Sequence, residues 1–215
     1  MGDMNATTRT ALTAIGISGS PSARSKSRAL LEHALAALAE RGVAVSLIDL
    51  ASLPSDALLG RRRSDDVEEA LARVRAATIV VASTPVYRAT YSGLLKVFFD
   101  LLPVDGLAEK IAVAIATGGS PAHQLVIDHG LRPLFGSVGA VTAPTGIYGT
   151  DAGFENGVPH RALIARIEQA ATEAVTLSHR IHVHPLDPTH TAVSDDAVSS
   201  VPSAAGVPSS TLGES

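Results

Sequence analysis

The sequence predicts an α/β protein with a doubly wound parallel sheet of five strands in the order 2-1-3-4-5. Short runs rich in Val, Ile and Ala alternate with longer segments of helical periodicity over most of the chain. These runs are apolar throughout rather than alternately polar, which is typical of parallel strands covered by helices on both faces. A six-stranded dinucleotide-binding sheet is the alternative, but the strand count falls short of it. In either sheet, ligands bind beyond the carboxyl ends of the strands.

The first half of the chain supplies three strands and three helices. We expect strands over residues 11–18, 43–49 and 78–83, and helices over 25–41, from 65 or 66 to 76, and over 92–102. The first helix has Leu30, Leu31 and Leu38 on one side, and Gly42 ends it. A loop around 53–63, with three consecutive arginines, leads to the second helix, which an aspartate caps. Pro103 closes the third helix.

The second half completes the sheet with two strands and two helices. The run over residues 111–116 predicts a fourth strand, and a helix follows near 122–134. A weaker fifth strand is expected over 140–147. The last helix is predicted over 159–181, because Leu163, Ile164, Ile167, Ala170 and Ala174 recur at helical spacing.

Charge and composition divide the chain of 215 residues, whose net charge is −4, into two parts. Residues 185–215 hold four of the 21 acids and none of the 17 Lys and Arg, and 16 of those 31 residues are Pro, Ser, Thr or Gly. Such a segment buries too little apolar surface to order itself, so we expect a disordered, acidic Pro/Ser-rich tail after a domain of residues 1–184. The domain is electroneutral, which argues against nucleic acid or an anionic membrane as a partner.

Several other classes of protein are excluded by what the sequence lacks. It has no Cys, so disulfide scaffolds, thiolate zinc sites and iron–sulfur clusters are excluded. No apolar run approaches the ~20 residues of a membrane span, and no secretory cleavage pattern is present, so we expect a cytoplasmic protein. His179, His182 and His184 lie near the end of the last helix without a nearby carboxylate, so no metal site is expected.

The loop after the first predicted strand carries the chemistry of a phosphate site. It reads Gly19-Ser20-Pro21-Ser22-Ala23-Arg24-Ser25-Lys26-Ser27 and leads directly into a helix. Free amides at a helix N-terminus, hydroxyl groups and a guanidinium are the donors that bind phosphate. The loop matches neither of the two common glycine-rich phosphate motifs, and a serine-rich N-cap without a ligand is the alternative.

Two more loops follow strands that the fold places beside the first. One reads Thr84-Pro85-Val86-Tyr87-Arg88-Ala89-Thr90-Tyr91 and could meet a flat heterocycle with backbone groups, although packing at a helix start would also explain its tyrosines. The other, Thr117-Gly118-Gly119-Ser120, lets the backbone approach a ligand closely. The three strand ends together predict a site for a phosphorylated ring compound.

These three motifs, in this order, resemble the NADPH-dependent FMN reductases of the flavodoxin-like superfamily over about residues 12–183. The sequence resembles especially those that supply reduced flavin to two-component alkanesulfonate monooxygenases. It implies that Ser20, Arg24, Ser25 and Ser27 bind the FMN phosphate. It also implies that Pro85, Val86, Tyr87 and Arg88, with Thr117, Gly118 and Gly119, border the isoalloxazine ring.

The reaction that the resemblance implies is hydride transfer from NADPH, or NADH, to FMN, with a flavin-dependent monooxygenase as partner. No catalytic residue is expected, because the two nucleotides carry the chemistry and the protein aligns them. A reductase of quinones, azo dyes or metal ions with bound flavin is an alternative. A flavodoxin-like electron carrier is another, but carriers of that kind are strongly acidic and cover the flavin with aromatic side chains.

We expect a homodimer or homotetramer. The helix after Tyr91 is apolar nearly all round, and a sheet can cover only one of its faces. The apolar residues are Leu94, Leu95, Val97, Phe98, Leu101 and Leu102. The resemblance implies that His129 lies in a widened helical turn at a subunit interface, where an alkanesulfonate-type reductase has Tyr and methanesulfonate-type relatives have His. An ordinary interface hydrogen bond and a role near the flavin both remain open for His129.

Overall fold

The sheet of the protein has the predicted order, with its last strand in two pieces. The computed structural model describes residues 11–22 and 24–183. The predicted tail, 185–215, lies outside the described residues, as do His184 and residues 1–10. Parallel strands follow the order β2-β1-β3-β5-β6, and β7 continues beside β5 after β6. The strands are β1 (Thr13–Ser18), β2 (Ala44–Asp49), β3 (Ile79–Tyr87), β4 (Thr90–Tyr91), β5 (Ile111–Thr117), β6 (Val141–Thr142), β7 (Ile147–Gly149), β8 (Phe154–Glu155) and β9 (Val158–Pro159).

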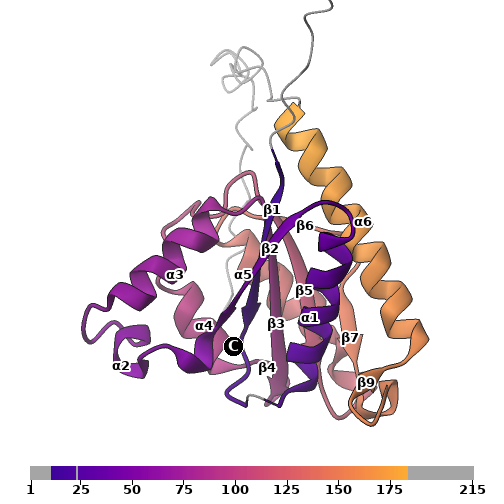
Figure 1. Cartoon of the computed structure of the whole chain (residues 1–215). Helices are drawn as coiled ribbons and strands as arrows, with labels where there is room; N and C mark the ends of the chain where they lie inside the picture. The colour runs from indigo at the N-terminus through magenta and orange to yellow at the C-terminus, as the bar shows by residue number, and fades with distance from the viewer. Residues whose placement is uncertain (1–10, 23, 184–215) are drawn as a thin grey trace, which may run out of the picture. The chain divides into compact units, whose positions relative to one another are not determined.

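Helices cover both faces of this sheet (Figure 1). The α-helices are α1 (Lys26–Ala39), α2 (Ser55–Leu58), α3 (Asp65–Ala76), α4 (Gly93–Phe99), α5 (Arg132–Gly136) and α6 (Arg161–Val183). One hydrophobic core lies between the sheet and α1 and α6, and the other between the sheet and α3, α4 and α5. The central strands β3 and β5 are buried on both faces, which explains their continuous apolar sequences. The doubly wound fold is therefore confirmed.

The predicted helix over 122–134 forms as three short helical pieces. They are a 3₁₀ turn η2 (Pro121–Leu125), a π-helical turn η3 (Ile127–Leu131) and α5. Pro133 has no N–H to donate, and the N–H of Arg132 bonds to the carbonyl of Ile127, five residues earlier. His129 lies in η3 and is exposed, so the widened turn expected at this residue is present.

Three other predicted features differ in detail. The loop expected around 53–63 contains the single turn α2, and Ser64 rather than an aspartate is the N-cap of α3. The third strand continues through Tyr87 and turns back into β4, so the segment expected as a loop is a β-hairpin.

Within the described residues, no helix has the length and hydropathy needed to cross a bilayer.

Candidate functional site

The loop after β1 is fixed to the neighbouring strand and helix by hydrogen bonds through Gly19. Its N–H donates to the carbonyl of Ser83 on β3 (2.8 Å), and its carbonyl accepts from Ser92 Oγ (2.5 Å). Ser92 is 1% exposed, caps α4 by accepting from the N–H of Leu95 (3.1 Å), and donates its own N–H to Thr84 Oγ1 (2.9 Å). One serine thus joins the loop, the start of the hairpin and α4. In the sequence, Ser92 is marked only as the start of a helix, because its partner Gly19 lies 73 residues away.

The predicted phosphate-binding residues lie in this loop, but their hydroxyl groups are engaged within it. Ser20 is buried and its Oγ accepts from the N–H of Ser22 (3.1 Å). Ser27 is fully buried, with its Oγ 2.7 Å from that of Ser25. Ser25 is the N-cap of α1, but its hydroxyl accepts no hydrogen bond from the backbone N–H groups of the first turn. Those N–H groups therefore have no capping side chain from Ser25. The side chain of Arg24 is exposed.

The hairpin formed by β3 and β4 projects beyond the carboxyl end of the sheet. Val86 pairs with Tyr91 and Tyr87 with Thr90, which leaves Arg88 and Ala89 as a two-residue turn. Both have positive φ, 51° and 68°, in the left-handed region that glycine and asparagine favour. Such strain persists only where the surrounding structure imposes it, and it clusters at functional sites. Pro85 and Val86 are half-buried, whereas Tyr87 and Arg88 are exposed.

The turn after β5 packs closely between the hairpin and the last strand. Thr117 is buried beside Pro85 in the sheet register, Gly118 is half-buried and Gly119 is exposed. A Cβ on Gly118 would lie 2.5 Å from Tyr148 Oη and 3.3 Å from Val86 Cβ. Tyr148 on β7 donates from this Oη to the carbonyl of Ser120 (2.6 Å), and burial raises the pKa of its phenol. Tyr148 was not among the site residues predicted from the sequence, because it lies one residue beyond the strand expected over 140–147.

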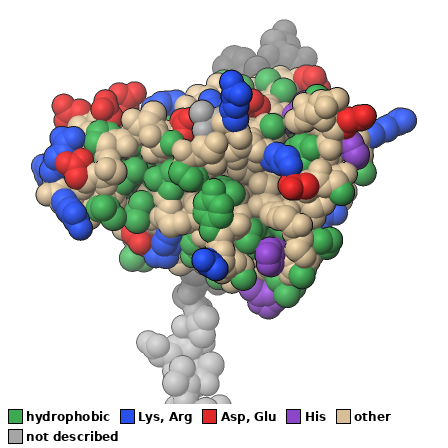
Figure 2. All heavy atoms as spheres, turned by 90° about the horizontal axis from the view of Figure 1, so that it is seen from below, with side chains coloured by type: hydrophobic (Ala, Val, Ile, Leu, Met, Phe, Trp, Pro, Cys, Tyr) green, Lys and Arg blue, Asp and Glu red, His purple; other side chains and the backbone are tan. Residues whose placement is uncertain are grey.

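All three predicted segments therefore meet at the carboxyl edge of adjacent strands, β1, β3 and β5. Figure 2 looks onto this edge, where hydrophobic side chains gather across the middle of the face and charged side chains of both signs, together with His, lie around them. Apolar side chains for a flat ring, with the exposed Arg24 available for a phosphate, suit a phosphorylated ring compound. Among the described residues, no group of three or more His, Asp or Glu side chains could hold a metal ion.

The fold and the site define a flavodoxin-like protein with its ligand edge at the switch point of the sheet. A family model described as NADPH-dependent FMN reductase matches residues 12–155. The chain therefore belongs to the NADPH-dependent FMN reductase family, as the three motifs predicted. It is an oxidoreductase of the NAD(P)H-dependent FMN reductase class, with FMN as its flavin and NAD(P)H as its electron donor.

Individual relatives agree with this assignment. The chain is 37% identical over 168 residues to an FMN reductase (NADPH) of Pseudomonas putida, covering 77% of this chain and 85% of the relative. It is 39% identical over 173 residues to the NADH-dependent FMN reductase SfnE of Pseudomonas putida, covering 78% and 93%. The solved apo structure of the NADH:FMN oxidoreductase EMOB is 33% identical and covers 83% of this chain and 92% of that one, with a TM-score of 0.71.

Proposed function

We propose that the protein binds FMN at the edge formed by the three segments, with the phosphate at residues 19–27 and the ring between the hairpin and the Gly118 turn. The donor set supports this assignment, because the first turn of α1 offers free amides, the half-buried Ser25 and the exposed Arg24. Since Ser20 and Ser27 are buried and bonded within the loop, they would hold its shape while Arg24, Ser25 and the amides contact the phosphate. The residues present thus fit a phosphorylated flavin.

The role of the protein in the reaction is to bind the two nucleotides and orient them. Bound FMN and NAD(P)H supply the redox chemistry themselves, as hydride transfer that needs no acid or base from the protein. Pro85 and Val86, with the close-packed Gly118, would fix the plane of the ring. The exposed Tyr87, Arg88 and Gly119 leave one side of the site open, which a nicotinamide can approach.

Replacing Arg24 by Ala tests the phosphate assignment. We expect the dissociation constant of FMN to rise by about 10- to 100-fold, the value of a lost charged hydrogen bond, while that of riboflavin stays unchanged. Titration of each flavin, followed by the change in its fluorescence, measures both constants. Arg63→Ala, at an exposed arginine between α2 and α3, serves as the matched control and should affect neither flavin. Equal losses for FMN and riboflavin would remove this loop from the phosphate site.

We further propose that FMN is a substrate that leaves after reduction and serves a flavin-dependent monooxygenase. The openness of the site supports release, because Tyr87 is 50% exposed and Gly119 is exposed as well. The neutral charge of residues 1–184 and the scarcity of aromatic side chains, 3% of the sequence, speak against a carrier that retains its flavin. Turnover of many equivalents of free FMN per subunit, with flavin removed by desalting, is the expected result. Stoichiometric flavin that survives desalting would contradict release.

We propose that a second copy of the chain covers the outer side of α4. Leu95, Phe98 and Leu102 are buried within the subunit, so the apolar stripe left for a partner consists of Leu94, Val97 and the following Leu101, all half-buried. Leu95 is fully buried, with its Cβ 2.9 Å from where a Cβ on Gly19 would lie. A charge at position 95 would therefore disrupt the core rather than the association alone.

Leu94→Glu tests this interface. We expect light scattering to give a wild-type mass of at least twice 22.0 kDa and a monomer for the variant, because a carboxylate would be desolvated in the contact. Val158→Glu changes a valine that is 62% exposed on β9 and should leave the assembly intact. A wild-type monomer at micromolar concentration would contradict the proposal.

A further inference from the structure

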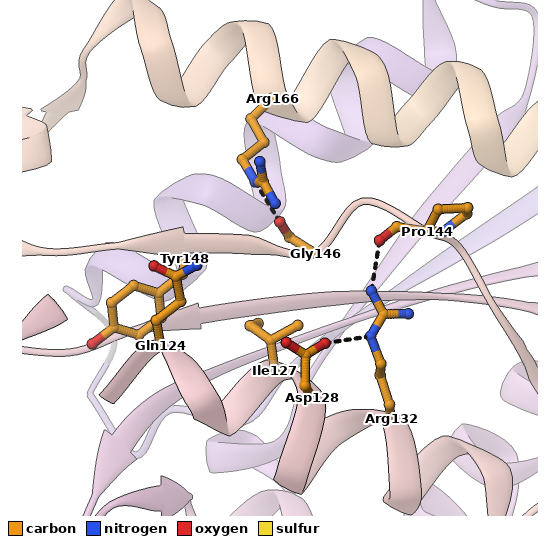
Figure 3. Close-up of a pocket in the computed structure, with 8 residues that line it drawn as sticks. All are labelled: Gln124, Ile127, Asp128, Arg132, Pro144, Gly146, Tyr148 and Arg166. Atoms are coloured by element: carbon orange, nitrogen blue, oxygen red, sulfur yellow. Dashed lines mark hydrogen bonds and ion pairs between the residues drawn. The ribbon is translucent and has the colours of Figure 1, made fainter. Parts of the chain in front are cut away.

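A separate cavity opens where the last strand of the sheet is interrupted. It has a volume of about 320 Å³, within the range of small-ligand pockets, and Figure 3 shows it between α6 on one side and η3 and α5 on the other. Tyr148 and Gln124 lie at one end of the cavity in this view, and Arg132 at the other. Because Tyr148 packs against Gly118, this cavity begins one side chain away from the proposed flavin site.

Arg132 has a structural role in this cavity. Its Nε donates to Asp128 Oδ1 (2.7 Å), its Nη1 to the carbonyl of Ala143 (3.1 Å) and its Nη2 to the carbonyl of Pro144 (2.6 Å). These carbonyls belong to the segment between β6 and β7, at the open edge of the sheet. All three nitrogens of the guanidinium are thus engaged, two of them with carbonyls of that edge.

Arg166 enters the same cavity from α6 with its donors only partly used. Its Nε donates to the carbonyl of Gly146 (2.6 Å), which fixes the orientation of the guanidinium (Figure 3). Within the described part of the chain, its Nη1 and Nη2 have no hydrogen-bond acceptor. A guanidinium held by one nitrogen, with its other donors open to a cavity, is a preorganised site for an anion.

The remaining polar groups define the kind of anion. Two carboxylates are near the arginines. Asp128 is bonded to Arg132, and Glu173 accepts from Thr145 and Gln169 and interacts electrostatically with Arg166, which helps to lower the pKa of Glu173 without taking up the Nη1 and Nη2 donors. The second oxygen of Asp128 and the amide of Gln124 remain for hydroxyl groups of a ligand. Open guanidinium donors, a hydroxyl acceptor and the side of a tyrosine ring together suit a phosphorylated ribose with an attached base.

We propose that this cavity binds the adenosine 2′-phosphate end of NADPH, with Arg166 as the residue that distinguishes NADPH from NADH. This inference rests on the proposed function. NADPH and NADH differ only in this phosphate, and the family includes relatives named for each donor. An arginine is the usual means of accommodating a 2′-phosphate. The nicotinamide end would reach the open side of the flavin site past Tyr148.

Nucleotide binding to the full-length protein tests the site without any requirement for flavin reduction. Calorimetry with 2′,5′-ADP and with 5′-AMP compares ligands that differ by the 2′-phosphate. We expect the wild type to bind 2′,5′-ADP about 10- to 100-fold more tightly, and Arg166→Gln to abolish this difference. Arg180→Gln is the matched control, because Arg180 is exposed on the same helix about 21 Å farther along its axis.

Steady-state kinetics provide the second measurement. Arg166→Gln should lower kcat/KM for NADPH about 10- to 100-fold and leave that for NADH unchanged. A wild type that binds 5′-AMP as tightly as 2′,5′-ADP would overturn the proposal without the use of any variant. So would inorganic phosphate that displaces 2′,5′-ADP at equal concentration, or a loss shared equally by NADPH and NADH. Selective binding of 2′,5′-ADP without FMN reduction would instead contradict only the proposed function.

Discussion

Replacing Ser92 by Ala is expected to lower the free energy of unfolding by about 2–4 kcal/mol. The hydroxyl of Ser92 caps α4 through the N–H of Leu95 and donates to the carbonyl of Gly19, and Ser92 is 1% exposed. Alanine removes the cap and leaves a buried carbonyl and a buried N–H without partners. Since the lost bond also fixes the loop that we propose to bind the phosphate, the affinity for FMN should fall with stability. Urea unfolding with an unchanged m-value measures the first effect.

Ser64→Ala is the matched control for this loss. Ser64 is also an N-cap, that of α3, but its side chain makes no capping hydrogen bond. We expect a change of less than about 0.5 kcal/mol. If both variants lost the same free energy of unfolding, neither the cap bond to Leu95 nor the bond to Gly19 would explain the loss at Ser92, because Ser64 makes no side-chain cap bond.

The sequence predicts the sheet well, and with it the meeting of the three loops at one edge, because both depend on strongly patterned segments. Strands such as Ile111–Thr117 are buried on both faces, so they require continuous apolar residues and are visible without any tertiary information. The three ligand loops are fixed by the same strands, because carboxyl ends of neighbouring parallel strands meet at one edge. Their convergence therefore follows from the predicted order of the strands.

What the sequence does not predict depends on contacts between distant residues. The hairpin turn at Arg88 and Ala89 lacks the asparagine or glycine that usually marks positive φ, so the segment resembles a loop. The fifth strand divides near Pro144, and the guanidinium groups of Arg132 and Arg166, from two different helices, satisfy the carbonyls there. Neither the bond from Ser92 to Gly19, 73 residues apart, nor that from Tyr148 to Ser120 has a local sequence signal.

Gly118→Ala is expected to cost about 1–3 kcal/mol of stability, whereas Gly119→Ala should cost less than about 0.5 kcal/mol. The added methyl at position 118 would lie 2.5 Å from Tyr148 Oη, while nothing lies within 4 Å of one at position 119. To make room, Tyr148 must move and give up its hydrogen bond to Ser120. Thermal or urea unfolding of the two adjacent glycine variants measures the difference, and equal losses would show that the contact with Tyr148 is not its cause.

The double variant Gly118→Ala/Tyr148→Phe separates the steric contact from the hydrogen bond. Without the hydroxyl, the nearest atoms to the new methyl are Val86 Cβ at 3.3 Å and the ring carbon Cζ at 3.4 Å, which small shifts can accommodate. Relative to Tyr148→Phe alone, the double variant should therefore lose less than about 0.5 kcal/mol of stability. The effects of the two substitutions would then be strongly non-additive, as expected for residues in contact. Additive losses would mean that the alanine at position 118 strains the backbone of the turn itself. The contact with Tyr148 would then not be the reason why this position requires glycine.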